Sequence, residues 1–315
     1  MELLKSVNLC KVFKKNSREN FYAVKNFDLV LKEGEIVGLL GPNGAGKTTT
    51  IKMLSHIVIP DKGDIFIKGK STLKRPREAM QSLSAVLEGN RNIYWKLTPR
   101  ENLLYFAGLR NVRKPAGRIR HLLDFFELED KKNTPCEKLS RGFQQRVAIA
   151  AALVSDPPIL LLDEPTLGLD VPNTLEIEQY LKDIAQNEGK TILVSSHIMP
   201  FVRKICSRLV IMNKGVILKE ESVESLLAFF KRTAYRFTLH KPVDIESLEK
   251  ALDFVIVENR KDEEAVCSLD LVLKEGKDIY RIFDILKNNH AGFVSVQKEE
   301  IDLEQAFMRI IGDEK

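Results

Sequence analysis

The stretch EIVGLLGPNGAGKT, residues 35–48, joins a run of aliphatic residues to a glycine-rich turn. Its second half fits the pattern G-x-x-x-x-G-K-[ST], which binds phosphate when it follows a strand and opens a helix. Glycines let such a loop wrap closely enough for backbone N–H groups to face the phosphates, and the helix aims the positive end of its dipole at the same charge. The sequence therefore predicts a phosphate-binding loop at the carboxyl end of a buried strand.

We expect this loop to hold a nucleoside triphosphate. Lys47 should reach the β- and γ-phosphates, and the Thr48 hydroxyl should bind Mg²⁺. The residues expected to form the nucleotide-binding loop are Gly41, Pro42, Asn43, Gly44, Ala45, Gly46, Lys47, Thr48 and Thr49.

A second aliphatic run, PILLLDE at residues 158–164, also ends in polar residues. In open parallel sheets, ligands bind beyond the carboxyl ends of such strands, so both runs should direct their chemistry to one edge. Asp163 is expected to hold Mg²⁺ through water, and Glu164 to polarise an attacking water. An acid at a strand end is often only a solvated cap, but its place after a phosphate loop favours the catalytic interpretation.

Composition places the chain among ordinary globular proteins. Its 315 residues suggest about two domains, and 44% apolar with 30% charged residues argues against a disordered or disulfide-stapled protein. The chain has 49 Lys and Arg and 44 Asp and Glu, so its formal net charge is 49 − 44 = +5, which is too small to imply nucleic-acid binding. We find no apolar run of about 18 residues, no signal-peptide pattern and no CxxC pair among the four cysteines, so a cytosolic chain with reduced cysteines is expected.

Two domains are predicted from a change of pattern near residue 220. The first two thirds alternates aliphatic strands with helical segments, at residues 98–109, 115–127 and 140–154, which is typical of an α/β domain. The remainder predicts the order βαββαβ of a small ferredoxin-like α+β unit, followed by a closing helix. Its expected elements are strand 235–240, helix 244–252, strands 254–257 and 265–273, helix 278–288, strand 292–297 and helix 303–311. We expect domains at 1–225, with a helical subdomain at about 90–155, and at 226–315.

A third motif, LSRGFQQR at residues 139–146, narrows the interpretation. It resembles the signature motif of ABC transporter ATPases, and EPTLGLD (164–170) and SSHIMPFV (195–202) follow in the order of that family. The resemblance covers essentially the whole first domain. It implies a P-loop ATPase fold with a mostly parallel core sheet, antiparallel N-terminal strands and a helical subdomain, acting on ATP with Mg²⁺.

The resemblance also implies a dimer. In the ABC family, the signature of one subunit covers the γ-phosphate held by the phosphate loop of the other, which assigns Ser140 and Gly142 to a site shared between two chains. Ser140 is by itself a good helix N-cap, which makes this segment a second anion-receiving helix terminus. Asp170 resembles the aspartate that crosses the dimer interface, and His197 the histidine that contacts the γ-phosphate. The partner is a second copy or a similar subunit.

By the same resemblance, Phe13 is expected to stack on adenine, with Val24 lining the same pocket. Tyr22 is a rival for the stacking role, and an aromatic in an amphipathic strand is often part of the core. Two residues depart from the family pattern. Glu88 stands where a glutamine is usual and is kept as a metal ligand, since a carboxylate also binds Mg²⁺. In the signature, Arg141 and Phe143 replace the usual third and fifth residues.

No membrane span is expected, so the resemblance implies a separately encoded permease and a peripheral location at the cytoplasmic face of the membrane. The segment at residues 89–106 looks like the stretch that, in exporters with ABC-2-type permeases, precedes the permease-contacting subdomain; Tyr94 and Trp95 line that groove or simply pack. The tail at 302–312 resembles the C-terminal extension of the same subgroup. The alternative is a soluble ABC-type ATPase acting on ribosomes or nucleic acid, whereas a GTPase-like switch fails because no NKxD motif follows the loop.

Overall fold

The structure is a computed structural model. It describes residues 1–16, 19–89, 92–240, 250, 252, 255–263, 265–273, 277–298, 307 and 310. The chain divides into two compact units, Met1–Glu221 and Ser222–Lys315.

The first unit is built on a six-stranded sheet of order β10-β9-β3-β8-β7-β6. Every neighbouring pair from β9 across to β6 is parallel. All five residues of β3, β7 and β8 are buried, as expected for parallel strands covered on both faces. The strands of this sheet are β3 (Ile36–Leu40), β6 (Leu83–Val86), β7 (Ile159–Asp163), β8 (Thr191–Ser195), β9 (Arg208–Asn213) and β10 (Val216–Ser222).

A four-stranded sheet of order β2-β1-β4-β5 accompanies it, with antiparallel pairing throughout. Its strands are β1 (Glu2–Asn16), β2 (Glu19–Lys32), β4 (Lys62–Ile67) and β5 (Lys70–Ser71). Buried residues of this sheet, of α1 and of one face of the parallel sheet form a single hydrophobic cluster. The expected fold, a mostly parallel core sheet with antiparallel N-terminal strands, is confirmed.

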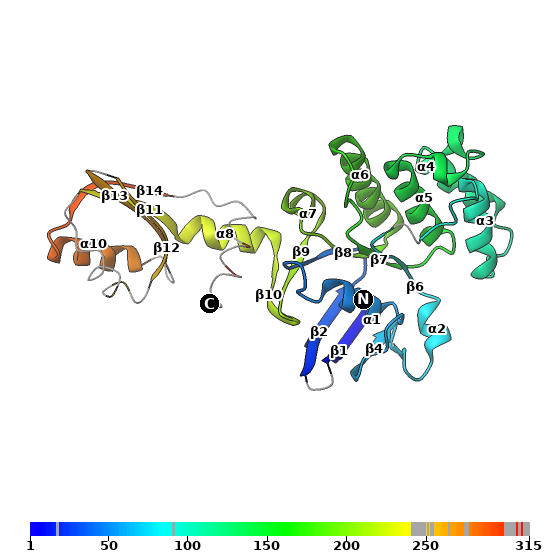
Figure 1. Cartoon of the computed structure of the whole chain (residues 1–315), viewed down its shortest axis with the longest axis horizontal. Coiled ribbons are helices and arrows are strands. Elements are labelled where there is room, and N and C mark those ends of the chain that lie inside the picture. Colours follow the sequence, from blue (N-terminus) through cyan, green and yellow to red (C-terminus); the bar gives the residue numbers. More distant parts are fainter. Residues whose placement is uncertain are drawn as a thin grey trace. The chain divides into compact units, whose positions relative to one another are not determined.

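Helices cover both faces of the parallel sheet. Figure 1 shows α6 and α7 on one face, and α1 with the antiparallel sheet on the other. Gly38 lets α7 approach β3, because a Cβ there would lie only 3.0 Å from Val202 Cγ1 and 3.1 Å from Cys206 Sγ. The helices are α1 (Lys47–Leu54), α2 (Pro76–Met80), α3 (Pro99–Leu109), α4 (Ala116–Phe125), α5 (Arg141–Leu153), α6 (Val171–Glu188) and α7 (Met199–Ile205), with short 3₁₀ turns at Glu129–Lys131 and Cys136–Lys138.

The three helical segments expected between the phosphate loop and β7 are α3, α4 and α5. Local chemistry fixes their ends. Thr98 caps α3 in a capping box with Glu101. The Thr98 hydroxyl accepts the Glu101 backbone N–H at 3.3 Å, and the Glu101 carboxylate accepts the Thr98 backbone N–H at 2.8 Å. Helix α4 ends at Phe125 and not at Glu127 as expected, because Glu127 has a left-handed φ of 52° and cannot continue the helix.

The second unit contains α8 (Val223–Thr233), β11 (Ala234–His240), β12 (Val255–Asp262), β13 (Val266–Leu273), α10 (Asp278–Asn288) and β14 (Gly292–Lys298). Its sheet has the order β12-β13-β11-β14 with antiparallel pairs, which is the strand order of a ferredoxin-like unit. Phe237, Leu239, Leu269 and Leu271 of the sheet pack with Ile282 of α10. The helices expected at 244–252 and 303–311 lie outside the described residues, apart from isolated positions.

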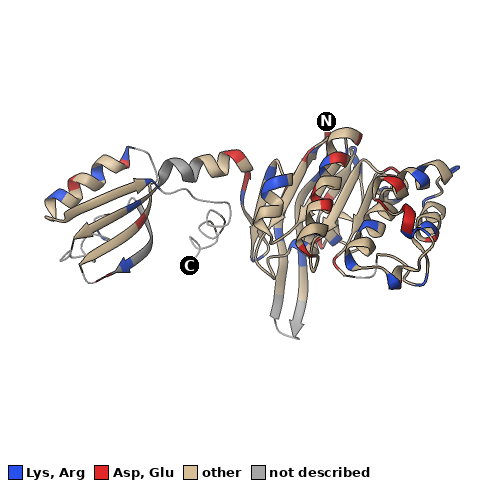
Figure 2. Ribbon diagram, turned by 90° about the horizontal axis from the view of Figure 1, so that it is seen from above, with Lys and Arg blue, Asp and Glu red and all other residues tan. Residues whose placement is uncertain are grey.

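Figure 2 shows Lys and Arg interspersed with Asp and Glu along the described helices and strands of both units. Within the part of the chain that the structure describes, no helix is both long and apolar enough to cross a bilayer.

Candidate nucleotide site

The glycine-rich loop runs from the end of β3 to the start of α1. Gly46 occupies the N-cap position with a left-handed φ of 103°, and a Cβ there would lie 2.4 Å from the carbonyl oxygen of Ala23. No side chain caps α1, and its first turn carries no acidic residue. Backbone N–H groups at this helix start are therefore directed at the loop, the arrangement that receives an anion.

Lys47 lies folded over this loop. Its Nζ donates to the carbonyl oxygens of Gly41 at 2.7 Å and Pro42 at 3.3 Å, and lies 3.9 Å from Glu164 Oε1. Its side chain is only 7% exposed. The ammonium group is thus placed between the loop and the acidic edge of the sheet, where phosphate charge would be neutralised.

The acidic edge is organised by hydroxyl groups from two other elements. Asp163, the last residue of β7, accepts hydrogen bonds at Oδ1 from Thr48 Oγ1 at 3.2 Å and from Ser195 Oγ at 2.6 Å. Ser195 Oγ also accepts the Glu164 backbone N–H at 3.0 Å. Sequence reasoning did not single out Ser195, because its position beside Asp163 follows from the parallel register of β7 and β8.

Asp163 Oδ2 is buried and has no hydrogen-bond partner among the described residues. A buried carboxylate oxygen of this kind fits a metal ion or a metal-bound water. No cluster of three or more His, Cys, Asp or Glu able to hold a metal exists in the described part of the chain. The Asp163 carboxylate and the Thr48 hydroxyl nevertheless suit Mg²⁺, because this ion is usually bound by one or two protein oxygens together with phosphates and waters.

Glu164 connects these groups to His197. His197 Nδ1 lies 2.9 Å from Glu164 Oε2, and the Glu164 side chain is 7% exposed. The backbone of Glu164 has a φ of 49°, which is unusual for a residue with a side chain, and strain of this type is concentrated at functional sites. The structure therefore brings Lys47, Glu164 and His197 together at one edge of the parallel sheet.

A pocket of about 510 Å³ lies at this edge. It is lined by the loop from Asn43 to Thr49, by Glu88, Glu164, Leu167 and His197, and by Phe13, Phe21 and Ala23 of the antiparallel sheet. Phe13 and Phe21 are paired across strands and are 44% and 48% exposed. Two aromatic faces are thus available to a base, where the sequence suggested one.

The expectation for Val24 is corrected. Val24 is 0% exposed and belongs to the hydrophobic core, whereas its neighbour Ala23 lines the pocket. Successive strand residues point to opposite faces, so Phe21 and Ala23 share the pocket side while Tyr22 and Val24 do not. Tyr22 lies outside the pocket lining, which leaves Phe13 and Phe21 as the aromatic candidates.

The signature segment begins α5. Ser140 is its N-cap and accepts the Phe143 backbone N–H at 3.4 Å. Gly142 packs against Asn173 of α6, since a Cβ on Gly142 would lie 1.9 Å from Asn173 Oδ1. Asp170 caps α6: its carboxylate accepts the Asn173 backbone N–H at 3.0 Å and the Asn173 side-chain amide at 2.6 Å. The bond from the Asn173 side chain is the main reason that the pKa of Asp170 is lowered.

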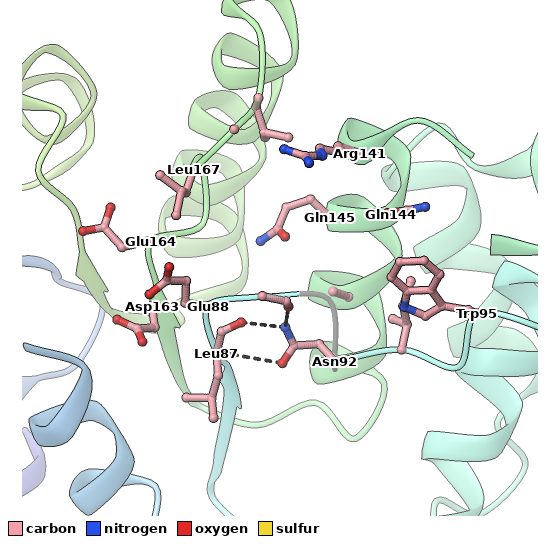
Figure 3. A pocket seen from close by; sticks show the side chains of 15 residues that line it. Leu87, Glu88, Asn92, Trp95, Arg141, Gln144, Gln145, Asp163, Glu164 and Leu167 are labelled. Atoms are coloured by element: carbon pink, nitrogen blue, oxygen red, sulfur yellow. Dashed lines mark hydrogen bonds between the residues drawn. The ribbon is translucent and has the colours of Figure 1, made fainter. Parts of the chain in front are cut away.

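Ser140, Gly142 and Asp170 do not line the phosphate-loop pocket. A second pocket of about 410 Å³ lies between the acidic edge and the start of α5 (Figure 3). Glu88, Asp163 and Glu164 line it from the sheet, and Arg141, Gln144 and Gln145 from the helix. Glu88 lines both pockets.

Comparisons with known proteins agree with this geometry. The family model described as ABC transporter matches residues 24–167. The ABC transporter ATP-binding protein NatA of Bacillus subtilis is 37% identical over 206 residues, 65% of this chain and 83% of that protein. The uncharacterized ABC transporter ATP-binding protein YhcH of the same organism is 30% identical over 292 residues, 88% of this chain and 93% of its own. Since 292 exceeds the 221 residues of the first unit, that similarity extends into the second unit.

Among solved structures, a dimeric structure of the bacterial ABC transporter cassette MJ0796 is 31% identical, with a TM-score of 0.63, over 70% of this chain and 99% of that one. A dimeric post-hydrolysis state of MJ0796, bound to ADP and Pi, gives a TM-score of 0.62 at the same identity. The chain therefore belongs to the ATP-binding proteins of ABC transporters. It is an ATPase that binds ATP with Mg²⁺. ATP-binding subunits of this family dimerise, as MJ0796 does, and partner with membrane permeases.

Proposed function

We propose that this chain drives export of a substrate through a separately encoded, ABC-2-type permease, as a peripheral subunit at the cytoplasmic face of the membrane. The observation that carries the ATPase part is the single cluster of Lys47, Glu164, His197 and Asp163 at the loop. The name of one relative supports export: the Nod factor export ATP-binding protein I of Burkholderia orbicola is 38% identical over 65% of this chain and 67% of its own length.

The proposed chemistry follows from the positions of the charged groups. Lys47 binds the β- and γ-phosphates in place of its present carbonyl acceptors, and Thr48, Asp163 and Glu88 hold Mg²⁺, which neutralises phosphate charge when bound. Glu164 accepts a proton from the attacking water, and His197 orients Glu164 and contacts the γ-phosphate. Phe13 and Phe21 hold the adenine ring.

We propose that the site is completed by a second copy of the chain. Within one chain, Ser140 and Gly142 lie outside the pocket of the phosphate loop, yet Ser140 begins a helix whose terminus suits an anion. Supplied by a partner, they would cover the γ-phosphate, with Asp170 at the same interface. Binding of ATP then favours the closed pair, and hydrolysis removes the contact that favours it.

Docking to the permease is proposed for an apolar surface of the helical subdomain. Tyr94, Leu104, Tyr105 and Leu109 are 49%, 55%, 39% and 60% exposed. The Tyr94 and Tyr105 hydroxyls lie 2.9 Å apart, which orders the two rings against each other. Tyr105 contacts Tyr94 and lies one helical turn from Leu109, so these three exposed side chains form a patch of the kind that is typical of a protein interface. For residues 226–315 we propose an accessory domain that supports the dimer or the permease contact.

A direct test is the hydrolysis of ATP by the purified chain. Lys47→Ala should abolish ATP binding measured by equilibrium dialysis, because the phosphates lose their buried cation. Lys52→Ala removes a lysine from the same helix, outside the pocket, and should bind and hydrolyse ATP as the wild type does. Equal binding by Lys47→Ala and the wild type would contradict the proposed site. Co-purification from membranes should identify a multi-spanning permease. In inside-out vesicles carrying the pair, whose ATP-binding subunits face the medium, export predicts ATP-dependent accumulation of substrate in the lumen. ATP-dependent release of preloaded substrate into the medium would contradict export.

A further inference from the structure

Gly142 is the second residue of α5, a position at which glycine weakens a helix relative to alanine. Its backbone is helical and lacks the left-handed φ that reserves Gly46 for glycine. The backbone conformation therefore does not explain why position 142 has no side chain. A neighbouring group must exclude the side chain instead.

That neighbour is the side chain of Asn173, in the first turn of α6. The three nearest atoms that a Cβ on Gly142 would meet are Oδ1, Cγ and Nδ2 of Asn173. The first two would overlap with the Cβ, and Nδ2 would lie 3.0 Å away. The Cβ direction at Gly142 thus points at α6, and any side chain there would displace the Asn173 amide.

The Asn173 amide is not free to turn aside, because it also holds Asp170. Its Nδ2 donates to Asp170 Oδ1 at 2.6 Å, and the Asn173 backbone N–H donates to the same oxygen at 3.0 Å. Only the nitrogen of the amide can donate to a carboxylate, so the amide oxygen is the end that faces Gly142. One amide group therefore connects the cap of α6 to the start of α5.

The residues on either side of this glycine are tied to the same part of the molecule. Arg141 Nη1 lies where Gly168 has no side chain, since a Cβ on Gly168 would be 2.8 Å away. Arg146 Cζ lies 4.8 Å from the centre of the Phe143 ring, and Arg146 forms an ion pair with Glu176 of α6. Arg141 and Phe143 are also the residues at which the signature departs from the family pattern. The start of α5 is thus held against residues 168–176 at three successive positions.

We propose that Asn173 is a positioning residue that fixes Asp170 against the signature segment, and that position 142 is a glycine because the Asn173 amide occupies the space of a side chain. The signature segment and Asp170 are then presented to a second chain as one unit. This consequence rests on the proposed function, because it takes both segments to meet a second chain. The contact between Asn173 and Gly142 does not depend on it.

Urea unfolding without nucleotide tests the contact itself. Trp95 is the single tryptophan and lies in the first unit, so its fluorescence follows the unfolding of that unit. Gly142→Ala should lower the urea midpoint of the wild type, because the new Cβ breaks the bond between Asn173 and its cap. In the Asn173→Ala background it should raise the midpoint and reduce the unfolding equilibrium constant by about two- to fivefold, the helix preference of alanine over glycine.

A matched glycine in α3 supplies the control for this reversal. A Cβ on Gly108 would meet nothing within 4 Å, so Gly108→Ala should raise the midpoint equally in the wild type and in Asn173→Ala. An effect of Gly142→Ala that has the same sign and size in both backgrounds would overturn the proposal.

Steady-state hydrolysis and equilibrium dialysis test the positioning. Asn173→Ala should lower kcat by about three- to tenfold, the range expected for one lost hydrogen bond to a charged group, and should leave the Kd of the single chain for ATP unchanged. Gly142→Ala should also lower kcat, but adding it to Asn173→Ala should cause no further loss. Asn187→Ala, at the exposed far end of α6, should match the wild type.

Two outcomes of the hydrolysis assay would overturn the positioning role. One is an unchanged kcat in Asn173→Ala. The other is a double variant that loses the full Gly142→Ala factor in addition to that of Asn173→Ala, because the glycine would then be needed for something other than Asn173. A Glu164→Gln chain that stays monomeric with ATP and Mg²⁺ would contradict the shared site alone, since the urea experiment still decides whether Asn173 and Gly142 interlock.

Discussion

Removing one hydroxyl, in Ser195→Ala, should separate the contribution of the acidic edge to catalysis from its contribution to stability. Ser195 is fully buried; its Oγ donates to Asp163 Oδ1 at 2.6 Å and accepts the Glu164 N–H at 3.0 Å. The Glu164 N–H keeps a second acceptor, the Ser195 carbonyl at 3.2 Å, so the main loss is at Asp163. A hydrogen bond to a charged group contributes about 1.5–3 kcal/mol, and we expect a loss of about 2 kcal/mol in the free energy of unfolding.

The same strand supplies the control. Thr191, at the other end of β8, is equally buried; its Oγ1 donates to the Lys32 carbonyl at 2.9 Å and accepts the Gly34 N–H at 2.9 Å. Thr191→Val removes this hydroxyl while keeping the shape of the side chain. Both lost bonds are between neutral groups, at about 1 kcal/mol each, so the expected destabilisation is also about 2 kcal/mol.

The assay is urea unfolding together with steady-state ATP hydrolysis. Both variants should unfold at lower urea, but only Ser195→Ala should lose kcat, by about tenfold or more, which corresponds to about 1.4 kcal/mol in the activation barrier. The reason is that only Ser195 orients Asp163 and Glu164. Equal kcat values in the two variants, or an equal loss in both, would refute the view that Ser195 positions the acidic pair.

Two other predictions address the adenine pocket and the ion pairs. Phe13→Ala and Phe21→Ala should each weaken ATP binding by about three- to tenfold in calorimetric titration, which is the range of one aromatic contact. Tyr22→Ala, on the other face of the strand, should leave ATP binding unchanged. Weaker binding in Tyr22→Ala alone would reverse the assignment. Asp156→Asn should lower Tm at about pH 7. A hydrogen bond from Lys190 lowers the pKa of Asp156 below its ordinary 3.8, so this contact stabilises the fold above pH 3.8 and is lost as the pH falls through the lowered value. The Tm difference should therefore vanish at low pH, and a constant difference would contradict the ion pair.

Features encoded in short stretches of sequence were predictable. The phosphate loop, the strands that end at Leu40 and Asp163, and the N-cap at Ser140 depend on neighbouring residues, and the structure has all of them. The helix expected at 278–288 is α10 within the same limits, because its apolar residues follow a helical period.

Features that depend on how strands align were less predictable. The sequence shows two adjacent aromatic residues in β2, Phe21 and Tyr22, which must point to opposite faces. Which of them meets the loop is set by the pairing of Phe13 with Phe21, in a ladder with several register shifts. Val24 was expected in the pocket from the family resemblance, and the register places it in the core instead. Ser195 was missed for a related reason: its contact with Asp163 arises from the parallel register of β7 and β8, which no local motif encodes.

The mass of Glu164→Gln in solution, measured by light scattering with saturating ATP and Mg²⁺, tests the central claim most directly. If hydrolysis is blocked while ATP still joins the phosphate loop of one chain to the Ser140 helix of the other, the variant should have twice the mass of one chain. Lys47→Ala in the same background should return it to a single chain. A Glu164→Gln chain that binds ATP but keeps the mass of a monomer would contradict the account.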